Sequence, residues 1–321
     1  MLRKAINARG YLRKAFLRYH REGYYKEENG GSSFIQRWTE HHLQHNLNDE
    51  QAANLQPGNA FAAVANTSAT ATWLVYYVFS NHLLLQACRE ELSKAVTITA
   101  EKDDGSIKTV CTLNIPYIKS SCHNLVAALQ ETLRVHGIGC TTRIVVEDEH
   151  LTDPDYPERR YLLKKGAVVF IPARVQHRLH SNGWGRGETD NPKSDDYDLD
   201  KFDHTRFLQK QGQKKERVRP GALRVFGGGA TLCPGRHFAT TEILAFVAML
   251  VLRLDIQPNV GNGRWPKPTT WKSSLVEAVE QPDRDIDVVL SVREEAAGKE
   301  WRVSYEGSEE AGHARILVQD M

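Results

Sequence analysis

The stretch from Phe226 to Arg236 reads FGGGATLCPGR. Three successive glycines lead to a cysteine, and a proline, a glycine and an arginine follow it. The next segment, up to about Leu254, is rich in apolar residues, which predicts a buried helix. The sequence therefore places one thiol at the end of a glycine-rich loop and at the start of a helix.

Several functions are compatible with such a loop. A dinucleotide-binding loop needs GxGxxG, but Leu232 stands where Gly227 and Gly229 would require a third glycine. A nucleophilic cysteine needs a base nearby, and His237 is a candidate. For a cysteine taken at random, a structural role as a small buried side chain is the better interpretation.

Ligation of a metal by a thiolate explains more of the pattern. Backbone N–H groups at a helix start stabilise the negative charge on Cys233. Glycines let the backbone approach a flat macrocycle closely, and Pro234 is typical of a first helical turn. Phe226 can lie against the macrocycle and shield the sulfur. These features favour haem b held by the Cys233 thiolate, a ligand that promotes cleavage of the O–O bond.

With these residues the sequence resembles the cytochrome P-450 family of haem-thiolate monooxygenases. The family signature F-x-x-G-x-x-x-C-x-G is matched at four positions. They are Phe226, Gly229, Cys233 and Gly235. The resemblance implies that Cys233 is the axial ligand of the haem iron and that Gly227 also belongs to the haem-binding loop.

A second motif of the family, E-x-x-R, is present as Glu131-Thr132-Leu133-Arg134. A spacing of three puts both side chains on one helix face, and an exposed pair of this kind contributes little to stability. The resemblance implies instead a buried pair joined by Arg206, from the segment KFDHTRFL. These three residues are expected to hold the scaffold around the cysteine loop. The dipeptides HR at 177–178 and WG at 184–185 also resemble the family.

The haem propionates are expected to need a different partner from the usual one. The family often has Arg or His two residues before the cysteine, and here Thr231 stands there. Arg143, in a strand that follows the E-x-x-R helix, matches a second position that often binds a propionate. The resemblance therefore implies that Arg143 binds the cofactor.

The family's oxygen-binding helix carries A-G-x-[D/E]-T, and this sequence has Ala63-Val64-Ala65-Asn66-Thr67. Hydroxyl groups inside a helix commonly bond back to the helix carbonyls. The resemblance implies instead that Thr67, together with Asn66, relays protons through water. An Ala-Asn-Thr here is similar to the sterol 7α-hydroxylase and prostacyclin synthase branch, and ATLCPGRHFATTEIL is similar to fungal members.

The expected fold is mainly α with small β-sheets, a cytochrome P-450 fold lacking its N-terminal part. Helices are expected over most of residues 1–50, over 58–96 and over 117–136, with a loop around Asp103 to Gly105 between the last two. Short strands are expected in TTRIVVED, LLKKGAVVFIPA and residues 283–292. Residues 1–292 are interpreted as one portion of a P-450 domain, and 293–321 as a charged, mobile tail. A truncated gene model, a degenerate gene or a real short protein would each explain the length.

Composition excludes other classes of protein. A net charge of +2 over 321 residues gives no reason to expect binding of nucleic acid. Five cysteines without CxxC spacing argue against a disulfide framework. No stretch has the length of a membrane span, so membrane association is expected only through the absent N-terminal part. A full-length relative would lie on the cytosolic face of the endoplasmic reticulum.

The resemblance implies a monooxygenase that inserts one oxygen atom from O2 into a lipophilic small molecule. A sterol, a terpenoid or another secondary metabolite would be the substrate. Electrons would come from NADPH through a cytochrome P-450 reductase, whose acidic surface fits the basic run Gln209 to Arg224. The alternatives are an isomerase or dehydratase of the same family, and an inactive fragment that binds no haem.

Overall fold

The computed structural model describes residues 2–153, 156–184, 193, 198–208, 221–260, 263–274 and 277–305. The chain divides into two compact units, residues 1–65 and residues 66–321. From the sequence, residues 1–292 were expected to form one portion of a domain. The boundary falls inside helix α3 (Asp49–Ser80), so no change of composition marks it.

The first unit is helical. It contains α1 (Leu2–Arg21), the short 3-10 helix η1 (Glu27–Asn29), α2 (Ser33–Gln44) and the beginning of α3. The Ser32 hydroxyl accepts a hydrogen bond from the Ile35 N–H at 3.4 Å and caps α2. These helices agree with the prediction of helices over most of residues 1–50.

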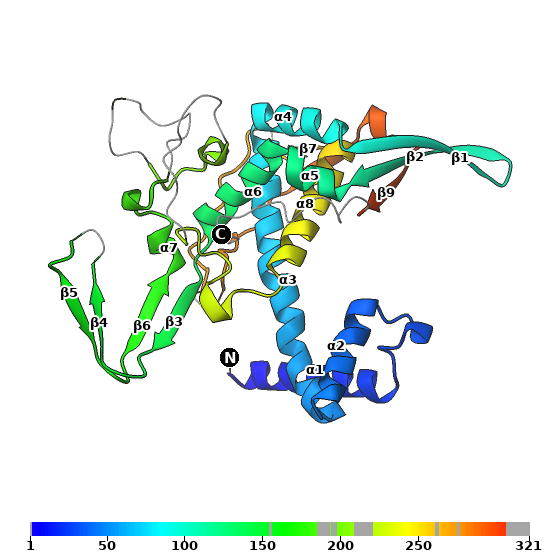
Figure 1. Cartoon of the computed structure of the whole chain (residues 1–321). Coiled ribbons are helices and arrows are strands. Elements are labelled where there is room, and N and C mark those ends of the chain that lie inside the picture. Colours follow the sequence, from blue (N-terminus) through cyan, green and yellow to red (C-terminus); the bar gives the residue numbers. More distant parts are fainter. Residues whose placement is uncertain are drawn as a thin grey trace. The chain divides into compact units, whose positions relative to one another are not determined.

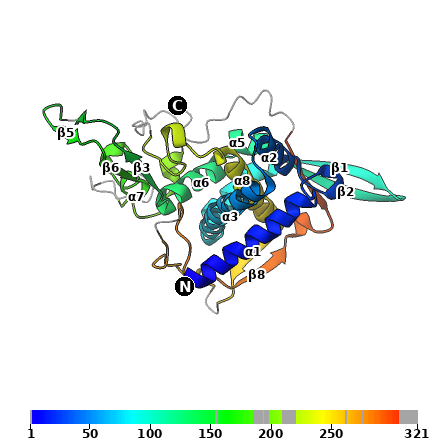
Figure 2. The same ribbon diagram turned by 90° about the horizontal axis from the view of Figure 1, so that it is seen from below.

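The second unit packs its helices around one apolar core. Its helices are the end of α3, α4 (His82–Ser93), α5 (Ile115–Ser121), α6 (His123–His136), α7 (Ala173–Gln176) and α8 (Arg236–Arg253). Leu74 of α3, Leu84 of α4, Leu129 of α6 and Leu244 of α8 are all buried in this core. Figures 1 and 2 show α3, α6 and α8 close together in this unit.

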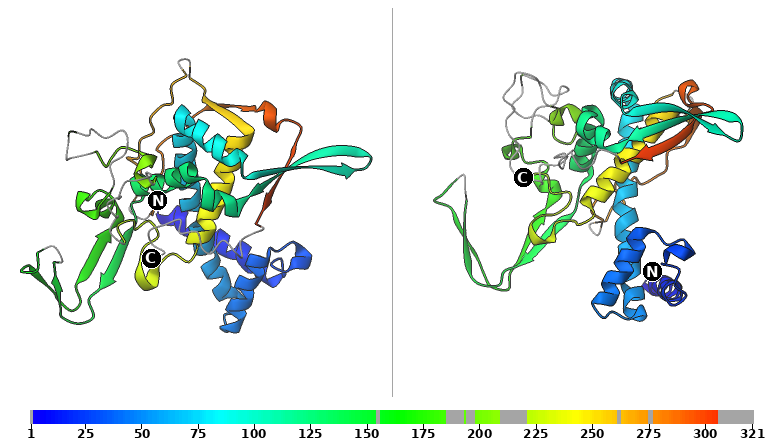
Figure 3. Two further views of the ribbon diagram at one scale, coloured as in Figure 1. Left: turned by 45° about the horizontal axis from the view of Figure 1, so that its top comes forward. Right: turned by 45° about the vertical axis from the view of Figure 1, so that its right-hand side comes forward.

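The strands form four small sheets beside these helices. The pairs are β3 (Cys140–Ile144) with β6 (Val168–Pro172), β4 (Glu149–Thr152) with β5 (Arg160–Leu163), and β7 (Leu254–Pro258) with β8 (Val288–Val292). All three pairs are antiparallel. The views of Figure 3 show β4 and β5 extending beyond β3 and β6. The prediction of a mainly helical fold with small sheets is confirmed.

The fourth sheet contains a hairpin that the sequence analysis missed. Strands β1 (Val96–Asp103) and β2 (Ser106–Asn114) pair antiparallel around Asp104 and Gly105, which both have positive φ, 44° and 82°. A two-residue Asp-Gly turn of this kind joins twisted strands well. The expectation of a loop was therefore wrong for the flanking strands, although the Asp-Gly pair between alternating residues is a known hairpin signal.

The expectation of a mobile tail was also wrong for part of residues 293–321. The 3-10 helix η5 (Glu294–Ala296) and strand β9 (Glu300–Ser304) follow β8. Strand β9 pairs in parallel with β2, with Val110 opposite Glu300 and Asn114 opposite Ser304. Charged residues concealed the strand because β9 is an edge strand with one face in solvent. Residues 306–321 lie outside the described ranges.

Large apolar side chains remain exposed on the small sheets. They include Ile144 on β3, Phe170 on β6, and Leu290 on β8. Among the described helices, none has both the length and the apolar composition that crossing a membrane requires.

Strand β9 should contribute to stability through its ladder with β2. A chain that ends after Lys299 loses this ladder, and we expect its free energy of unfolding in urea to fall by roughly 2–4 kcal/mol. A chain that ends after Tyr305 keeps β9 and serves as the control. An equal loss in both chains would show that β9 does not support the fold.

Candidate functional site

The cysteine loop is closed by its own backbone. The Cys233 N–H donates a hydrogen bond of 2.9 Å to the Phe226 carbonyl. Between these residues the chain turns through Gly227 and Gly229, whose φ angles of 81° and 61° lie in the left-handed region. Side chains other than hydrogen are disfavoured there, so the two glycines are required by the path of the loop.

The loop leaves the thiol accessible. Cys233 is partly exposed, and none of the described residues forms a hydrogen bond to its Sγ. A Cβ added at Gly235 would lie 3.9 Å from this sulfur, and a Cβ at Gly228 would lie 2.8 Å from Arg224 Nη1. The glycines therefore leave the space beside the loop backbone free of side chains, next to Cys233 Sγ at Gly235 and next to Arg224 at Gly228.

The helix after the loop starts slightly later than expected. Helix α8 begins at Arg236 with Gly235 as its N-cap, so Pro234 precedes the helix instead of lying in its first turn. The Arg236 side chain donates to the Cys233 carbonyl at 3.2 Å. This contact ties the end of the loop to the start of the helix.

Arg143 reaches the loop from strand β3. Its Nη2 donates to the Gly228 carbonyl at 3.0 Å and to the Thr231 hydroxyl at 2.9 Å. Its Nη1 donates to the adjacent Thr142 carbonyl at 2.8 Å. A guanidinium has five N–H donors, so two remain for an anionic group. Arg143 thus contacts Thr231, the residue that stands where the family often has a basic one.

Glu131 and Arg134 form a fully buried ion pair on α6. Arg134 Nε donates to Glu131 Oε2 and Arg134 Nη2 donates to Glu131 Oε1, both at 2.7 Å. Both side chains have no exposed surface. Burial raises the pKa of the Glu131 carboxyl, and the guanidinium groups of Arg134 and Arg206 oppose that shift. The bidentate geometry is the strongest form of such a pair.

Arg206 completes this cluster, which we call the Glu131 network. Its Nε lies 3.5 Å from Glu131 Oε1, and it belongs to the 3-10 helix η3 (His204–Phe207). The Asp203 N–H donates to the same carboxylate oxygen at 3.0 Å. The structure thus brings together the three residues that the sequence analysis assigned to the scaffold.

Arg134 also forms hydrogen bonds to the backbone of two segments that are distant in the sequence. Its Nη1 donates to the carbonyls of His177, at 3.0 Å, and of Leu199, at 2.8 Å. One buried guanidinium therefore joins α6 to the segment after α7 and to the segment before η3.

His177 connects this network to the cysteine loop, a role that sequence reasoning missed. Its Nε2 accepts from the Arg224 N–H at 3.0 Å, which leaves Nδ1 to donate to the Arg134 carbonyl at 3.0 Å. Burial, and next the charge of Arg134, lower the pKa of His177 to about 3. A neutral ring is needed, because a protonated Nε2 could not accept. The HR dipeptide marked the position but not this function.

The oxygen-helix residues lie on α3. Asn66 Oδ1 accepts from the Ala278 N–H at 3.2 Å. Thr70 and Thr72 bond back to the carbonyls of Asn66 and Ser68 at 2.8 Å. The Thr67 hydroxyl forms no hydrogen bond within the described part of the chain, so it does not follow the back-bonding pattern of its neighbours. No hydrogen bond among the described residues joins Asn66 or Thr67 to the cysteine loop.

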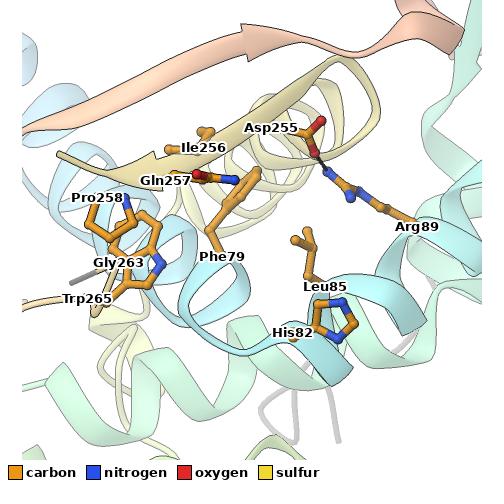
Figure 4. A pocket seen from close by; sticks show the side chains of 10 residues that line it. All are labelled: Phe79, His82, Leu85, Arg89, Asp255, Ile256, Gln257, Pro258, Gly263 and Trp265. Carbon is orange, nitrogen blue, oxygen red and sulfur yellow. Dashed lines mark hydrogen bonds and ion pairs between the residues drawn. The ribbon is translucent and has the colours of Figure 1, made fainter. Parts of the chain in front are cut away.

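One expected feature and one cavity give no site among the described residues. Of the basic run Gln209 to Arg224, residues 209–220 lie outside the described ranges. A cavity of about 420 Å³ lies where α3 and α4 meet β7, and Phe79, Trp265 and the ion pair of Arg89 with Asp255 line it (Figure 4). None of its lining residues belongs to the cysteine loop.

The residues around Cys233 fit a haem better than a bare metal ion. Among the described residues, no group of three or more His, Cys, Asp or Glu side chains is arranged to hold an ion. One accessible thiol, a thin glycine loop and a nearby arginine with free donors are what a macrocycle with carboxylate substituents requires. The donor set thus agrees with haem ligation.

Breaking the Glu131 network should unfold the protein readily. Glu131→Gln leaves the buried guanidinium of Arg134 without its counter-charge, and we expect a loss of about 3–5 kcal/mol in the free energy of unfolding in urea. Glu22→Gln, which removes the exposed pair of Glu22 with Arg18, is the control and should change nothing measurable. Equal stabilities of the two variants would contradict the account.

His177 should make stability depend on pH. Its folded-state pKa of about 3 lies below the ordinary value of 6.5, so the unfolded chain takes up the proton first as the pH falls. Stability is then lost from about pH 6.5 downward, by about 1.4 kcal/mol per pH unit for this residue.

We expect His177→Gln to show a shallower fall of unfolding free energy between pH 6 and pH 4 than the parent chain. The comparison of slopes cancels the contribution of the carboxylates that both proteins share. Identical slopes would mean that His177 is not held neutral.

Comparison with known proteins identifies the family. The cytochrome P450 family model matches residues 1–281. The chain is 32% identical over 308 residues to cytochrome P450 monooxygenase nodJ of Hypoxylon pulicicidum, a match that covers 93% of this chain and 54% of that protein. A cytochrome P450 monooxygenase of Gibberella zeae is 33% identical over 218 residues, with 67% of this chain and 37% of that protein covered.

The likeness extends to sterol enzymes. The 25-hydroxycholesterol 7-alpha-hydroxylase of Rattus norvegicus is 26% identical over 209 residues, covering 62% of this chain and 45% of that protein. The chain spans about half the length of these relatives, or less. The expected resemblance is confirmed, and because the family model takes in helix α3, the buried ion pair and the cysteine loop alike, this chain belongs to the cytochrome P450 family.

Proposed function

We propose that this chain binds haem through Cys233 and forms the haem-ligating part of a monooxygenase. The observation that carries the proposal is the closed glycine loop that holds an accessible thiol. When bound, haem supplies the iron at which O2 is activated, and one oxygen atom enters a lipophilic substrate.

The residues of the loop would divide the work of holding the haem. Cys233 supplies the thiolate, and Gly227, Gly229 and Gly235 keep the backbone thin enough for the ring to approach. Phe226 is partly buried and packs against the core, and it would cover the sulfur once the haem is bound. A shielded thiolate keeps its electron density on the iron, because few hydrogen bonds draw it away.

Arg143 would bind a propionate with the donors that remain on its guanidinium. Its contacts to Gly228 and Thr231 hold the guanidinium beside the loop. The arginine would thus link the carboxylate of the haem to the loop that carries the iron ligand.

Thr67 would hold and pass protons through water during the reaction. Its hydroxyl is not engaged by the helix backbone among the described residues, so it is available as both donor and acceptor. The nearby threonines Thr70 and Thr72 instead donate their hydroxyls to backbone carbonyls of the same helix.

Electrons would come from NADPH through a cytochrome P450 reductase on the cytosolic face of the endoplasmic reticulum. The proposed substrate is a sterol, a terpenoid or another secondary metabolite. Support comes from the relatives, which include fungal P450 monooxygenases and a 7-alpha-hydroxylase that acts on 25-hydroxycholesterol.

The thiolate ligand can be tested by spectroscopy. We expect the chain, loaded with haem, reduced and saturated with carbon monoxide, to show the red-shifted Soret band typical of thiolate ligation. Cys233→Ala should lose this band. Cys140→Ala, which changes the other exposed cysteine outside the loop, should keep it. A band typical of histidine ligation in the parent chain would overturn the proposal.

A further inference from the structure

Residues 277–281 lie along one face of α3, and we call them the strap. Val279 is buried against Ala69 and Trp73 of α3. Trp73 Nε1 donates to the Glu280 carbonyl at 2.8 Å. The strap is therefore tied to α3 by packing as well as by hydrogen bonds.

The backbone of Ala278 forms hydrogen bonds both to helix α3 and to the segment that follows α6. Its N–H donates to Asn66 Oδ1 at 3.2 Å. Its carbonyl accepts from the N–H groups of Ile138 and Gly139 at 2.9 and 3.1 Å. The Asn66 side chain thus links α3, one residue before Thr67, to the chain that follows the E-x-x-R helix.

Glu280 fixes the other end of the strap. Its N–H donates to the His136 carbonyl at 2.9 Å. Its buried carboxylate lies 3.1 Å from His136 Nδ1 and also pairs with Arg174 of α7. Burial raises the pKa of Glu280, but the hydrogen bond from His136 and the charge of Arg174 outweigh burial and lower it. Glu280 is therefore an ionised anchor.

The protonation state of His136 decides which atom donates in each hydrogen bond around Glu280. Burial lowers the pKa of His136, so the ring is neutral and Nδ1 donates to the carboxylate. His136 Nε2 then accepts from the Tyr77 hydroxyl of α3 at 2.8 Å. Trp73 stacks on the same ring with centroids 3.7 Å apart. Among the described residues, the polar groups of Glu280, His136, Tyr77 and Trp73 named here all have partners, which makes the anchor rigid.

We propose that Asn66 is a positioning residue, whose side-chain oxygen holds the strap against the turn of α3 that carries Thr67, the residue proposed for the proton relay. This inference rests on the proposed function and revises the expectation that Asn66 handles protons itself. The family motif has an acid at this position, and only an acceptor oxygen is needed to hold the Ala278 N–H. An aspartate would keep the contact, whereas an alanine would remove it.

Hydrogen exchange on the full chain tests the contact directly. We expect Asn66→Ala to speed exchange in peptides covering residues 277–281 by about fivefold, because one hydrogen bond is lost. Asn66→Asp should keep the parent rate. Thr72→Ala, which removes only an exposed back-bond on the same helix, is the matched control and should also keep it.

A second variant keeps the test valid if Asn66→Ala fails to fold. Trp73→Phe removes the donor to the Glu280 carbonyl but keeps an aromatic ring, and it should also speed exchange in the strap. Unchanged exchange in both Asn66→Ala and Trp73→Phe would overturn the proposal, whether or not the chain binds haem.

The second readout separates the strap from proton transfer. With haem and a reductase, we expect Asn66→Ala and Trp73→Phe to lower the share of consumed NADPH that ends in product, because water reaches Thr67 more easily. Asn66→Asp should keep that share. If Asn66→Asp and Asn66→Ala both change the share while exchange in the strap stays at the parent rate, Asn66 acts on protons and the proposal fails. A chain that binds no haem would refute the proposed function but leave the exchange result valid.

Discussion

The buried carboxylate of Glu131 is the constraint on which the candidate site depends. It is surrounded by two guanidinium groups and one backbone N–H. Arg134 lies on the same helix as Glu131, whereas Arg206 and the Asp203 N–H belong to η3 and its N-cap. Arg134, held by this carboxylate, also donates hydrogen bonds to the carbonyls of His177 and Leu199. The His177 ring then reaches Arg224, two residues before Phe226. The position of the cysteine loop thus follows from a charge that cannot stay buried alone.

A second buried carboxylate organises the opposite side of the E-x-x-R helix. Glu280 binds His136, the last residue of α6, and draws the strap against α3. Asn66, seven residues before Trp73 on the same helix, holds the same strap through the Ala278 N–H. Helix α6 therefore takes part in two ionic clusters. The first connects through His177 to Arg224, just before the cysteine loop, and the second connects to helix α3, which carries Thr67.

Local motifs in the sequence predicted the parts of the site that depend on spacing. Cys233 with its glycines, and Glu131 with Arg134, lie within single short segments, so their geometry follows from loop and helix periodicity. The roles of His177 and Glu280 depend on partners far along the chain, and no local pattern shows them. The hairpin β1–β2 was missed although its Asp-Gly turn signals it, and β9 was missed because an edge strand can be charged.

The central claim is that this scaffold presents Cys233 as the ligand of a haem iron. Iron K-edge X-ray absorption of the haem-loaded chain measures that bond directly. The account predicts one sulfur neighbour of the iron, which disappears in Cys233→Ser. An iron surrounded only by nitrogen and oxygen in the parent chain would contradict it.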